Sequence, residues 1–365
     1  MKIIESINSL LGRSKKEPFV SVDIGTSSIK VMELDVNTTP FTVTAAAIAP
    51  TPADAISNNT VTKPQEVASV LKALLEENDI QTKKAVFCVP GPAVFTKKTT
   101  TAAVSLDQLQ STIIYEASNY IPHKIEAVYF DYQVIGKANS AYEVLLVAVK
   151  NEVVQSYVEA IRLAGLDPAI ADVDYFALEN MFEINYPEES SKTIALIDIG
   201  ARFSGVTILQ NGKSLFTGDV GVGSRLYTDA LCEALQMKPS EAEASKRGQF
   251  ASGYDVASIQ ETIERTTEHI AAELHRQLGF FWNASGTDLP IEEVFLTGGG
   301  AQLAGLAEEL GAKTGLQCRM LEPFRALSWR ENFDAEYIKE ITSSMAVSVG
   351  LAARRFGDKH HQIQG

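Results

Sequence analysis

One stretch of the chain places several phosphate-binding groups beside a carboxylate that can hold a metal ion. Residues 19–35 read FVSVDIGTSSIKVMELD, which predicts a strand, a tight turn over residues 25–28 and a returning strand. Gly25 lets the backbone approach a ligand closely, and Lys30 adds a positive charge. Asp23 stands just before the turn, where its carboxylate can hold hydrated Mg²⁺. Three hydroxyl side chains can join the turn amides in donating to phosphate oxygens: Thr26, Ser27 and Ser28.

A second copy of this pattern strengthens the prediction of a phosphate site. A glycine turn between two strands is often only a hairpin, so the first copy alone is weak evidence. Residues 193–209 read TIALIDIGARFSGVTIL and repeat the strand, the Asp-Ile-Gly turn and the returning strand. Two such hairpins predict two similar halves that face each other. Asp23 and Asp198 would then converge, and two carboxylates repel each other unless a cation lies between them.

A third glycine turn is suited to the base and sugar of a nucleotide. Residues 294–306 read VFLTGGGAQLAGL, which predicts a strand, three glycines and then a helix. A bare glycine backbone can lie against a flat purine and its sugar, and the start of a helix favours the phosphate side.

Composition indicates an ordinary globular protein with room for two domains. The chain has 365 residues, of which 45% are hydrophobic and 21% charged. The net charge of -14 and the lack of a basic, aromatic-rich cluster argue against a nucleic-acid surface. Three cysteines, Cys88, Cys232 and Cys318, have neither metal-ligand nor redox spacing, which fits a reducing cytoplasm. No apolar run approaches the roughly twenty residues that cross a bilayer.

The two ends of the chain differ in character. Residues 1–16 place five apolar side chains on one stripe of a short helix with basic residues around its ends. Such a helix could dock on a partner, lie on an anionic membrane surface or fold back on its own domain. The last residues, FGDKHHQIQG, have too few apolar side chains for an amphipathic membrane helix.

Between the two hairpins, the pattern predicts a compact insertion. Residues 94–165 read as strand, helix, strand, strand and helix, with Ser105 beginning the first helix and Asn151 capping the second. The chain then returns as a strand over residues 168–174, so Asp172 and Asp174 stand where ligands collect in open α/β sheets. Residues 238–282 read as mostly helical, and a last helix is expected over residues 341–355.

These motifs together resemble the nucleotide-binding set of the actin-like ATPase superfamily, over almost the whole chain from Phe19 to Phe356. The resemblance implies an α/β, actin-like (ribonuclease H-like) fold of two lobes with duplicated mixed sheets and an ATP cleft between them. It implies ATP and Mg²⁺ as ligands, with Asp23 and Asp198 at the metal, and Asp174 and Asp198 as catalytic carboxylates. The implied nucleotide contacts are Asp23, Gly25, Thr26, Ser27, Ser28 and Lys30 in the first turn, Asp198, Gly200, Arg202 and Ser204 in the second, Gly221 and Gly223, Glu243 and Lys246, and Gly298, Gly299, Gly300 and Gln302.

Within that superfamily, the insertion resembles the relocated small subdomain of the FtsA and PilM families. The segments VDIGTSSIKVMEL, PHKIEAVYFDYQVI and ADVDYFALENMFE are most similar to the PilM family. This implies a cytoplasmic ATP-binding platform of type IV pilus machines at the inner face of the inner membrane. It also implies capture of the N-terminal tail of a PilN-like membrane protein in a groove beside the insertion. Contacts with other pilus platform proteins and a homo-oligomer are further options that the resemblance leaves open.

The resemblance also divides the chain into subdomains. The expected parts are a short amphipathic segment (1–17), subdomain 1A (18–93 with 166–190 and 341–356), an FtsA-type inserted subdomain 1C (94–165), subdomain 2A (191–237 with 288–340), helical subdomain 2B (238–287) and a flexible tail (357–365).

Several alternatives stay open at this point. Glu243 and Lys246 could form an ion pair on a helix surface, Arg202 could be a solvated loop residue, and Asp172 could cap a helix. In the family the connecting strand usually ends in Glu-Pro, whereas here it ends in Asp174 and Tyr175. The shorter carboxylate predicts slow or absent hydrolysis. Rival functions are an FtsA-like cell-division or filament-forming ATPase and an ATP-dependent small-molecule kinase.

Overall fold

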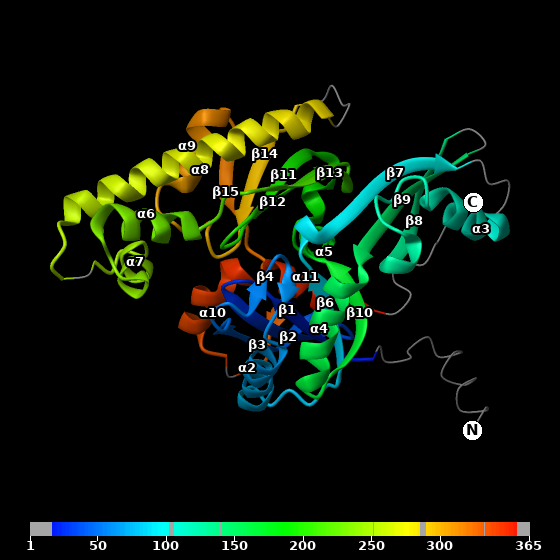
Figure 1. Cartoon of the computed structure of the whole chain (residues 1–365), viewed down its shortest axis with the longest axis horizontal. Helices are drawn as coiled ribbons and strands as arrows, with labels where there is room; N and C mark the ends of the chain where they lie inside the picture. The colour runs from blue at the N-terminus through cyan, green and yellow to red at the C-terminus, as the bar shows by residue number, and fades with distance from the viewer. Residues whose placement is uncertain are drawn as a thin grey trace.

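The chain folds into two lobes with a smaller sheet at one side (Figure 1). The computed structural model describes residues 17–101, 106–138, 141–250, 252–284, 290–331 and 333–355. The expected helix over residues 1–16, the predicted start of a helix at Ser105 and the expected tail over residues 357–365 lie outside the described residues.

The first lobe is built on a six-stranded sheet in the order β10-β6-β1-β2-β3-β16. Its central strand is buried at every position, as a strand covered on both faces must be. Strands β1, β2 and β3 form an antiparallel meander, whereas β6 and β10 run parallel to β1. The strands are β1 (Val20–Ile24), β2 (Ser28–Asp35), β3 (Thr42–Pro50), β6 (Lys84–Val89), β10 (Asp167–Val173) and β16 (Ser328–Trp329).

The second lobe repeats this arrangement with a five-stranded sheet in the order β13-β12-β11-β14-β15. Strands β11, β12 and β13 form an antiparallel meander, and β14 and β15 extend the sheet from β11 as parallel strands. The two sheets therefore have equivalent topologies, and the prediction of two similar halves is confirmed. The strands are β11 (Thr193–Ile199), β12 (Ser204–Gln210), β13 (Lys213–Val220), β14 (Glu293–Thr297) and β15 (Gln317–Met320).

Helices cover both sheets. In the first lobe α2 (Pro64–Glu77) and α4 (Asn151–Leu163) pack on one face, where α2 begins with proline at its first turn. In the second lobe α6 (Arg225–Leu235), α8 (Val256–Ala284) and α9 (Leu306–Thr314) cover the outer face, with α7 (Pro239–Ser245) against α6. The long helix α8 spans the top of the second lobe in Figure 1.

Helices α5 (Asp174–Asn185) and α11 (Ala346–Ala352) lie between the two sheets and join the lobes. One apolar core includes side chains of β2 and β3, of β11 and β14, and of these two helices. The helices cross so closely that a Cβ on Gly350 would lie 1.7 Å from the backbone oxygen of Ala177. Only glycine permits this approach, so the contact between the lobes depends on it.

The smaller sheet is the predicted insertion. Strands β7 (Val94–Thr101), β8 (Val128–Ala138) and β9 (Ala141–Lys150) pair antiparallel in the order β7-β9-β8, and α3 (Leu106–Ala117) packs on them. Short 3₁₀ turns, η1 (Gly91–Ala93) and η2 (Ile125–Ala127), precede β7 and β8. Helix α4, which sequence analysis assigned to the insertion, packs instead in the core of the first lobe, because Val154, Tyr157 and Ile161 face α2 and β6.

Some local predictions were wrong at identifiable residues. Asn151 does not cap α4: the cap position is Lys150, and the Asn151 amide donates to the backbone oxygen of Glu126. Residues 50–61, for which no strand was predicted, contain a hairpin of β4 (Ile56–Ser57) and β5 (Thr60–Val61). Its turn residues Asn58 and Asn59 have positive φ angles of 49° and 62°, as a two-residue hairpin turn requires.

The last predicted helix, over residues 341–355, is three elements. Helix α10 (Ala335–Ile341) was missed, and η4 (Thr342–Met345) separates it from α11. The hydroxyl of Thr342 donates to the backbone oxygen of Ile338, and Thr-Ser-Ser sequences compete in this way with regular helix hydrogen bonds. A further 3₁₀ turn, η3 (Pro187–Ser191), forms the charged link between the lobes.

Candidate functional site

The two Asp-Ile-Gly turns have the same backbone geometry. In the first, the Gly25 amide donates to the Ser28 oxygen at 3.0 Å, and in the second, the Gly200 amide donates to the Phe203 oxygen at 3.0 Å. Asp23 is paired across its hairpin with Lys30, and Asp198 is paired at the same place in its hairpin with Gly205. The repeat that the sequence predicted is therefore a repeat of the turn as well as of the strands.

Lys30 lies between the aspartates of the two turns. Its ammonium group is 2.8 Å from Asp23 Oδ2, and both side chains are almost buried. Burial lowers the pKa of Lys30, but attraction to Asp23 and also to Asp198 outweighs it, so the pKa is raised overall. Burial raises the pKa of Asp198 to about 6, while Lys30 opposes and Asp23 adds to that shift. Lys30 is thus attracted to the aspartates of both turns, and the magnesium ion predicted between them stays a prediction.

Asp174 occupies the start of α5, where the sequence placed it. Its carboxylate accepts hydrogen bonds from the amides of Gly91, at 2.9 Å, and Tyr175, at 2.7 Å. Burial, followed by repulsion from Asp219 and Asp198, raises its pKa to about 8 despite those bonds. The raised pKa favours the protonated form of Asp174, and a protonated carboxyl cannot accept a proton from water.

Asp219 is an acidic residue that sequence reasoning missed. It lies on β13 of the second lobe, yet its Oδ1 would be 2.9 Å from a Cβ on Gly91, and Asp174 Oδ1 would be 3.2 Å from the same point. Burial raises the pKa of Asp219, although part of its side chain remains open to solvent. The signal available was its place in the glycine-rich stretch over residues 218–223, but nothing in that pattern indicates a contact with residues 91 and 174.

The glycines of the third turn pack against the second turn. Gly298 has a φ of +88°, and a Cβ there would lie 2.3 Å from Asp198 Oδ1. A Cβ on Gly300 would lie 2.6 Å from the Ile199 side chain, and one on Gly223 would lie 2.5 Å from the Ala201 oxygen. These glycines therefore allow the third turn and the segment at Gly223 to pack closely on the second turn, which is a reason for them in addition to the predicted contact with a base.

The helix after the triple glycine begins later than expected. Helix α9 starts at Leu306, after an irregular segment, with Gly305 in a left-handed conformation before it. The first amides of α9 are thus not adjacent to Gly298–Gly300. The sequence predicted that a helix would begin directly after these glycines, beside the phosphates, and this part of the prediction was wrong.

Glu243 and Lys246 form the ion pair that was weighed as an alternative. Lys246 Nζ lies 2.7 Å from Glu243 Oε1 and also donates to Thr228 Oγ1 at 3.1 Å and to the Ser224 oxygen at 3.3 Å. The Lys246 side chain is 6% exposed, whereas that of Glu243 is 43% exposed. Lys246 thus ties α7 to the start of α6, and Glu243 is the member of the pair that a ligand can reach more easily.

The remaining predicted residues differ in accessibility. Ser204 is buried and donates to the Val222 oxygen at 2.8 Å, so its hydroxyl is already used. Asp172 is buried and bonds to Arg354, at 2.6 Å, as well as to the amide of Val173. The exposed residues are Thr26, Ser27, Arg202, Gly221, Gly299 and Gln302, while Ser28, Gly25 and Gly200 are half-buried.

Comparison with known proteins identifies the family. The family described as Type IV pilus assembly protein PilM matches residues 21–356. The chain belongs to the PilM family. Its residues match the fold of a solved structure described as the PilM-PilN type IV pilus biogenesis complex with a TM-score of 0.81. That match is 28% identical and covers 93% of this PilM-family chain and 98% of the other. The family resemblance predicted from sequence is confirmed.

More distant structures establish the wider fold. The ethanolamine utilization protein EutJ from Carboxydothermus hydrogenoformans matches with a TM-score of 0.57 and 15% identity, over 92% of this chain and 89% of that one. MreB5 of Spiroplasma citri bound to ADP matches with a TM-score of 0.50 and 10% identity, over 92% and 95%. The predicted actin-like fold is confirmed for this PilM-family member.

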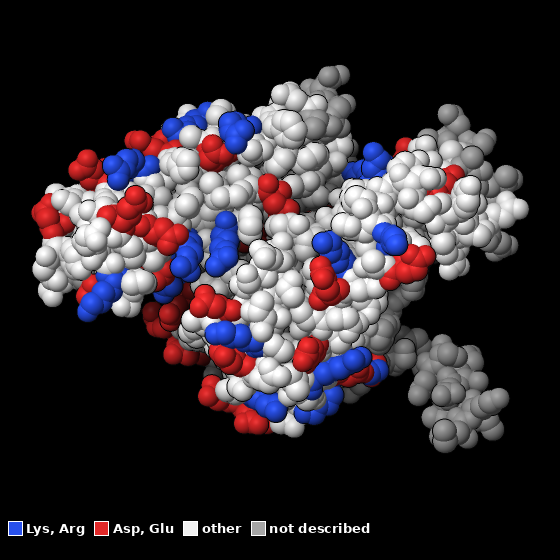
Figure 2. All heavy atoms as spheres, in the orientation of Figure 1, with Lys and Arg blue, Asp and Glu red and all other residues white. Residues whose placement is uncertain are grey.

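Neither a membrane-spanning helix nor a surface of one charge sign is seen in the described part of the chain and on the face in Figure 2. Within them, no helix is both long enough and apolar enough to span a membrane. On the face of the molecule in Figure 2, Lys and Arg side chains are interspersed with Asp and Glu over both lobes.

Proposed function

We propose that this PilM-family protein is an ATP-binding adaptor of the type IV pilus assembly platform, which holds the cytoplasmic N-terminal tail of a PilN-like membrane protein. The observation that carries the nucleotide part is the meeting of Asp23, Lys30 and Asp198 at two turns of equal geometry. The family match and the resemblance to a PilM-PilN complex support the partner part.

The residues at the two turns fit a magnesium nucleotide. The nearly buried Lys30 balances the negative charges of Asp23 and Asp198 in this structure. A divalent cation bound to a polyphosphate would be attracted to the same two carboxylates. Lys30 and the exposed hydroxyls of Thr26 and Ser27 would bind phosphate oxygens, and Asp23 and Asp198 would hold Mg²⁺ through its water shell. The metal would supply positive charge that stabilises the phosphates.

The base and ribose would lie toward the third turn. The exposed Gly299 offers its backbone groups to them, and Glu243 offers a half-exposed carboxylate for ribose hydroxyls. Gln302, which was predicted to join them, lines a different cavity. Gly200, Arg202, Gly221 and Gly223 would complete the phosphate side. In this proposal Ser204, Lys246, Gly298 and Gly300 act as positioning residues, because their groups already bond or pack within the protein.

Hydrolysis would be slow at most. A carboxylate that positions or deprotonates the attacking water must be ionised, and the raised pKa of Asp174, about 8, opposes this at neutral pH. ATP would then serve as a switch or a structural ligand.

A hollow on α4 is the surface that we propose for the partner tail. It has a volume of about 570 Å³ and is lined by Glu152, Gln155, Ser156, Val158, Glu159, Arg162 and Leu163. It adjoins the inserted sheet through the hydrogen bond of Gln155 to Tyr129, and the first lobe through the bond of the Val61 amide to Ser156. Tyr129 and Leu163 are exposed apolar surfaces there, at 48% and 40%.

The charges of this hollow suit a basic tail. Cytoplasmic segments next to a membrane span are enriched in Lys and Arg, and Glu152 and Glu159 would attract them. Binding such a tail would hold the protein at the inner face of the inner membrane.

The nucleotide part is tested by calorimetry with Mg-ATP on the wild type and on Asp23→Ala. We expect the variant to lose most of its affinity, whereas Asp167→Ala, an exposed aspartate at the edge of the same sheet, should bind normally. Unchanged affinity in Asp23→Ala would refute the site. ATP consumption that depends on an added small acceptor would instead indicate a kinase, and ATP-dependent sedimentation would indicate a filament.

The partner part is tested with a synthetic peptide of the PilN tail from the same organism. Charge reversal in Glu152→Lys/Glu159→Lys should weaken peptide binding at low salt by about tenfold or more. Glu76→Lys/Glu77→Lys, at two exposed positions of α2, is the matched double charge reversal away from the hollow and should have little effect. Equal loss in both would show that only net charge matters.

A further inference from the structure

A second cavity, outside the two Asp-Ile-Gly turns, lies where the second lobe meets α10 and η4. Its volume is about 720 Å³, within the usual range for small-molecule sites. Its walls come from the segment after the triple glycine, from the end of β15 and the loop beyond it, and from α10 with η4. Three successive segments of the chain, all within residues 301–343, thus line it.

The cavity contains a buried hydroxyl whose hydrogen-bonding capacity is unused. Ser343 is 3% exposed, and among the described residues its Oγ has no hydrogen-bond partner. The backbone oxygen of the same residue is engaged, because it accepts from the Gly298 amide at 2.9 Å and from Thr297 Oγ1 at 3.0 Å. A buried, unpaired hydroxyl costs free energy, so a ligand that pairs with it would be favoured there.

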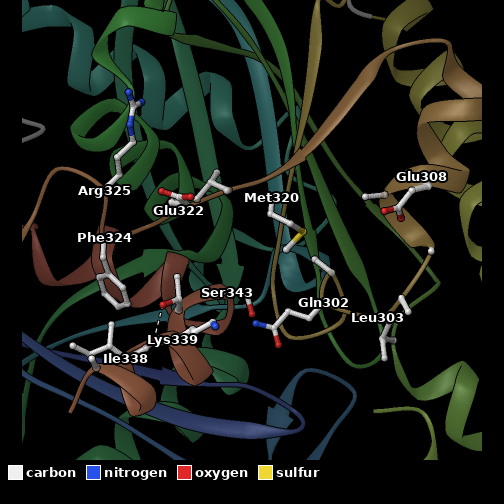
Figure 3. A pocket seen from close by; sticks show the side chains of 17 residues that line it. Gln302, Leu303, Glu308, Met320, Glu322, Phe324, Arg325, Ile338, Lys339 and Ser343 are labelled. Carbon is white, nitrogen blue, oxygen red and sulfur yellow. Dashed lines mark hydrogen bonds between the residues drawn. The ribbon is translucent and has the colours of Figure 1, made fainter. Parts of the chain in front are cut away.

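Two more donors point to the same place. In Figure 3 the side chains of Gln302 and Lys339 extend toward Ser343 from opposite sides of the cavity. A lysine ammonium, a side-chain amide and a hydroxyl together make a corner rich in hydrogen-bond donors with one positive charge. Such a corner is suited to an oxyanion, a carboxylate or a phosphate, because charge-assisted hydrogen bonds are the stronger ones.

Apolar side chains line the cavity beside the donor corner, and its acidic side chains lie away from that corner. Phe324 and Ile338 stand beside the donor corner, and Met320, which is 37% exposed, stands above it (Figure 3). Glu322 and Glu308 also line the cavity, but their side chains lie away from Lys339 in the same view.

The other cation at the cavity is already committed. Arg325 bonds to Glu188 and lies over the Tyr186 ring, 4.8 Å from its centroid. It extends away from the donor corner in Figure 3, so Lys339 is the charge that an anion in the cavity would meet.

From this arrangement we infer that the cavity is a binding site for a small amphipathic oxyanion, with its carboxylate or phosphate at Ser343, Gln302 and Lys339 and its apolar body against Phe324, Ile338 and Met320. Such a ligand would contact both the second lobe and α10. It would also sit behind the turn at Gly298, to which Ser343 is bonded through its backbone.

The test uses 1-anilinonaphthalene-8-sulfonate, an aromatic body that carries an anionic oxygen group, with fluorescence as the readout. Octanoate and octyl phosphate are added as competitors to distinguish the carboxylate from the phosphate. We expect saturable binding to the full chain that one of these competitors reverses. Lys339→Ala should weaken probe binding about tenfold. Lys72→Ala, an exposed lysine of α2, is the matched control and should leave binding unchanged.

Ser343→Ala separates a ligand site from a merely structural serine. The substitution keeps the backbone oxygen that holds Gly298, and it removes an unpaired buried hydroxyl, so the variant should fold and be at least as stable as the wild type. A ligand role predicts weaker probe binding in this variant. The proposal is overturned if Lys339→Ala and Ser343→Ala both bind the probe as the wild type does. It is also overturned if saturating Mg-ATP displaces the probe, since the cavity would then be part of the nucleotide site.

Discussion

Lys98 connects the inserted sheet to the second lobe, because its ammonium group lies 2.6 Å from the backbone oxygen of Ser214. It also donates to the Leu215 oxygen at 3.0 Å. Lys98 belongs to β7, and its two acceptors belong to β13, which pairs with the strand that follows the second Asp-Ile-Gly turn. The two bonds of Lys98 therefore connect the insertion, beside which we propose that the partner tail binds, to the sheet that carries the second Asp-Ile-Gly turn.

Removing this lysine should loosen the contact between insertion and second lobe. We expect Lys98→Ala to lower the free energy of unfolding by only about 1 kcal/mol, because the bonds are at the surface. Hydrogen exchange at the amides of β13 should become faster. Lys97→Ala, whose side chain points to the other face of β7, is the control and should change neither quantity. Unchanged exchange in Lys98→Ala would mean that the bonds do not hold the strands together.

In the absence of Mg²⁺, replacing Lys30 should lower the free energy of unfolding. In Lys30→Met, Asp23 and Asp198 keep their burial but lose the charge that balances them. We expect a loss of about 3 kcal/mol in urea unfolding. Added Mg²⁺ should restore part of this free energy in the variant. It should stabilise the wild type by a smaller amount, because Lys30 is already present there. A variant as stable as the wild type would show that the carboxylates are balanced in another way.

Asp174 should make the protein less stable as the pH rises. Its pKa is raised from 3.8 to about 8 in the folded chain, so between these values the folded chain keeps a proton that the unfolded chain has lost. The free energy of unfolding contributed by this residue therefore falls as the pH rises from about 4 to about 8. Asp174→Asn retains an oxygen for the Gly91 amide and cannot ionise, so it should flatten this part of the profile.

The measurement for Asp174 is urea unfolding at several pH values, with Asp167→Asn as the exposed control. Equal slopes in Asp174→Asn and the wild type would mean that Asp174 ionises normally. A flatter slope in both variants would point to a general effect of charge.

Gly350 should be the least replaceable glycine at the junction of the lobes. A Cβ there would overlap the backbone of Ala177, at 1.7 Å, so Gly350→Ala must push α11 away from α5. We expect a loss of at least about 3 kcal/mol or failure to fold. Gly279→Ala is the matched control in the exposed part of α8, where a Cβ meets nothing within 4 Å. That change should stabilise the protein by about 0.5 to 1 kcal/mol, since alanine favours a helix.

Features encoded in short stretches could be predicted from the sequence. The two Asp-Ile-Gly hairpins, the order of strands and helices in the insertion and the glycine turn at residues 298–300 each depend on neighbouring residues. Local propensity, turn chemistry and burial patterns act over such distances, and the structure has these elements where the patterns placed them. Where the signal was ambiguous, as in the Thr-Ser-Ser segment before α11, the boundaries were wrong.

Contacts between distant segments were decided only by the tertiary structure. Asp219 meets Gly91 and Asp174, Lys98 meets β13, and Ser343 faces Gln302 and Lys339, and no periodicity in the sequence indicates these partners. The raised pKa of Asp174 depends on burial and on two carboxylates from the other lobe. By itself, the sequence determined where the two Asp-Ile-Gly turns form. Packing of the two lobes decided which charges face one another, because burial and electrostatic interactions depend on distance in space and not on separation along the chain.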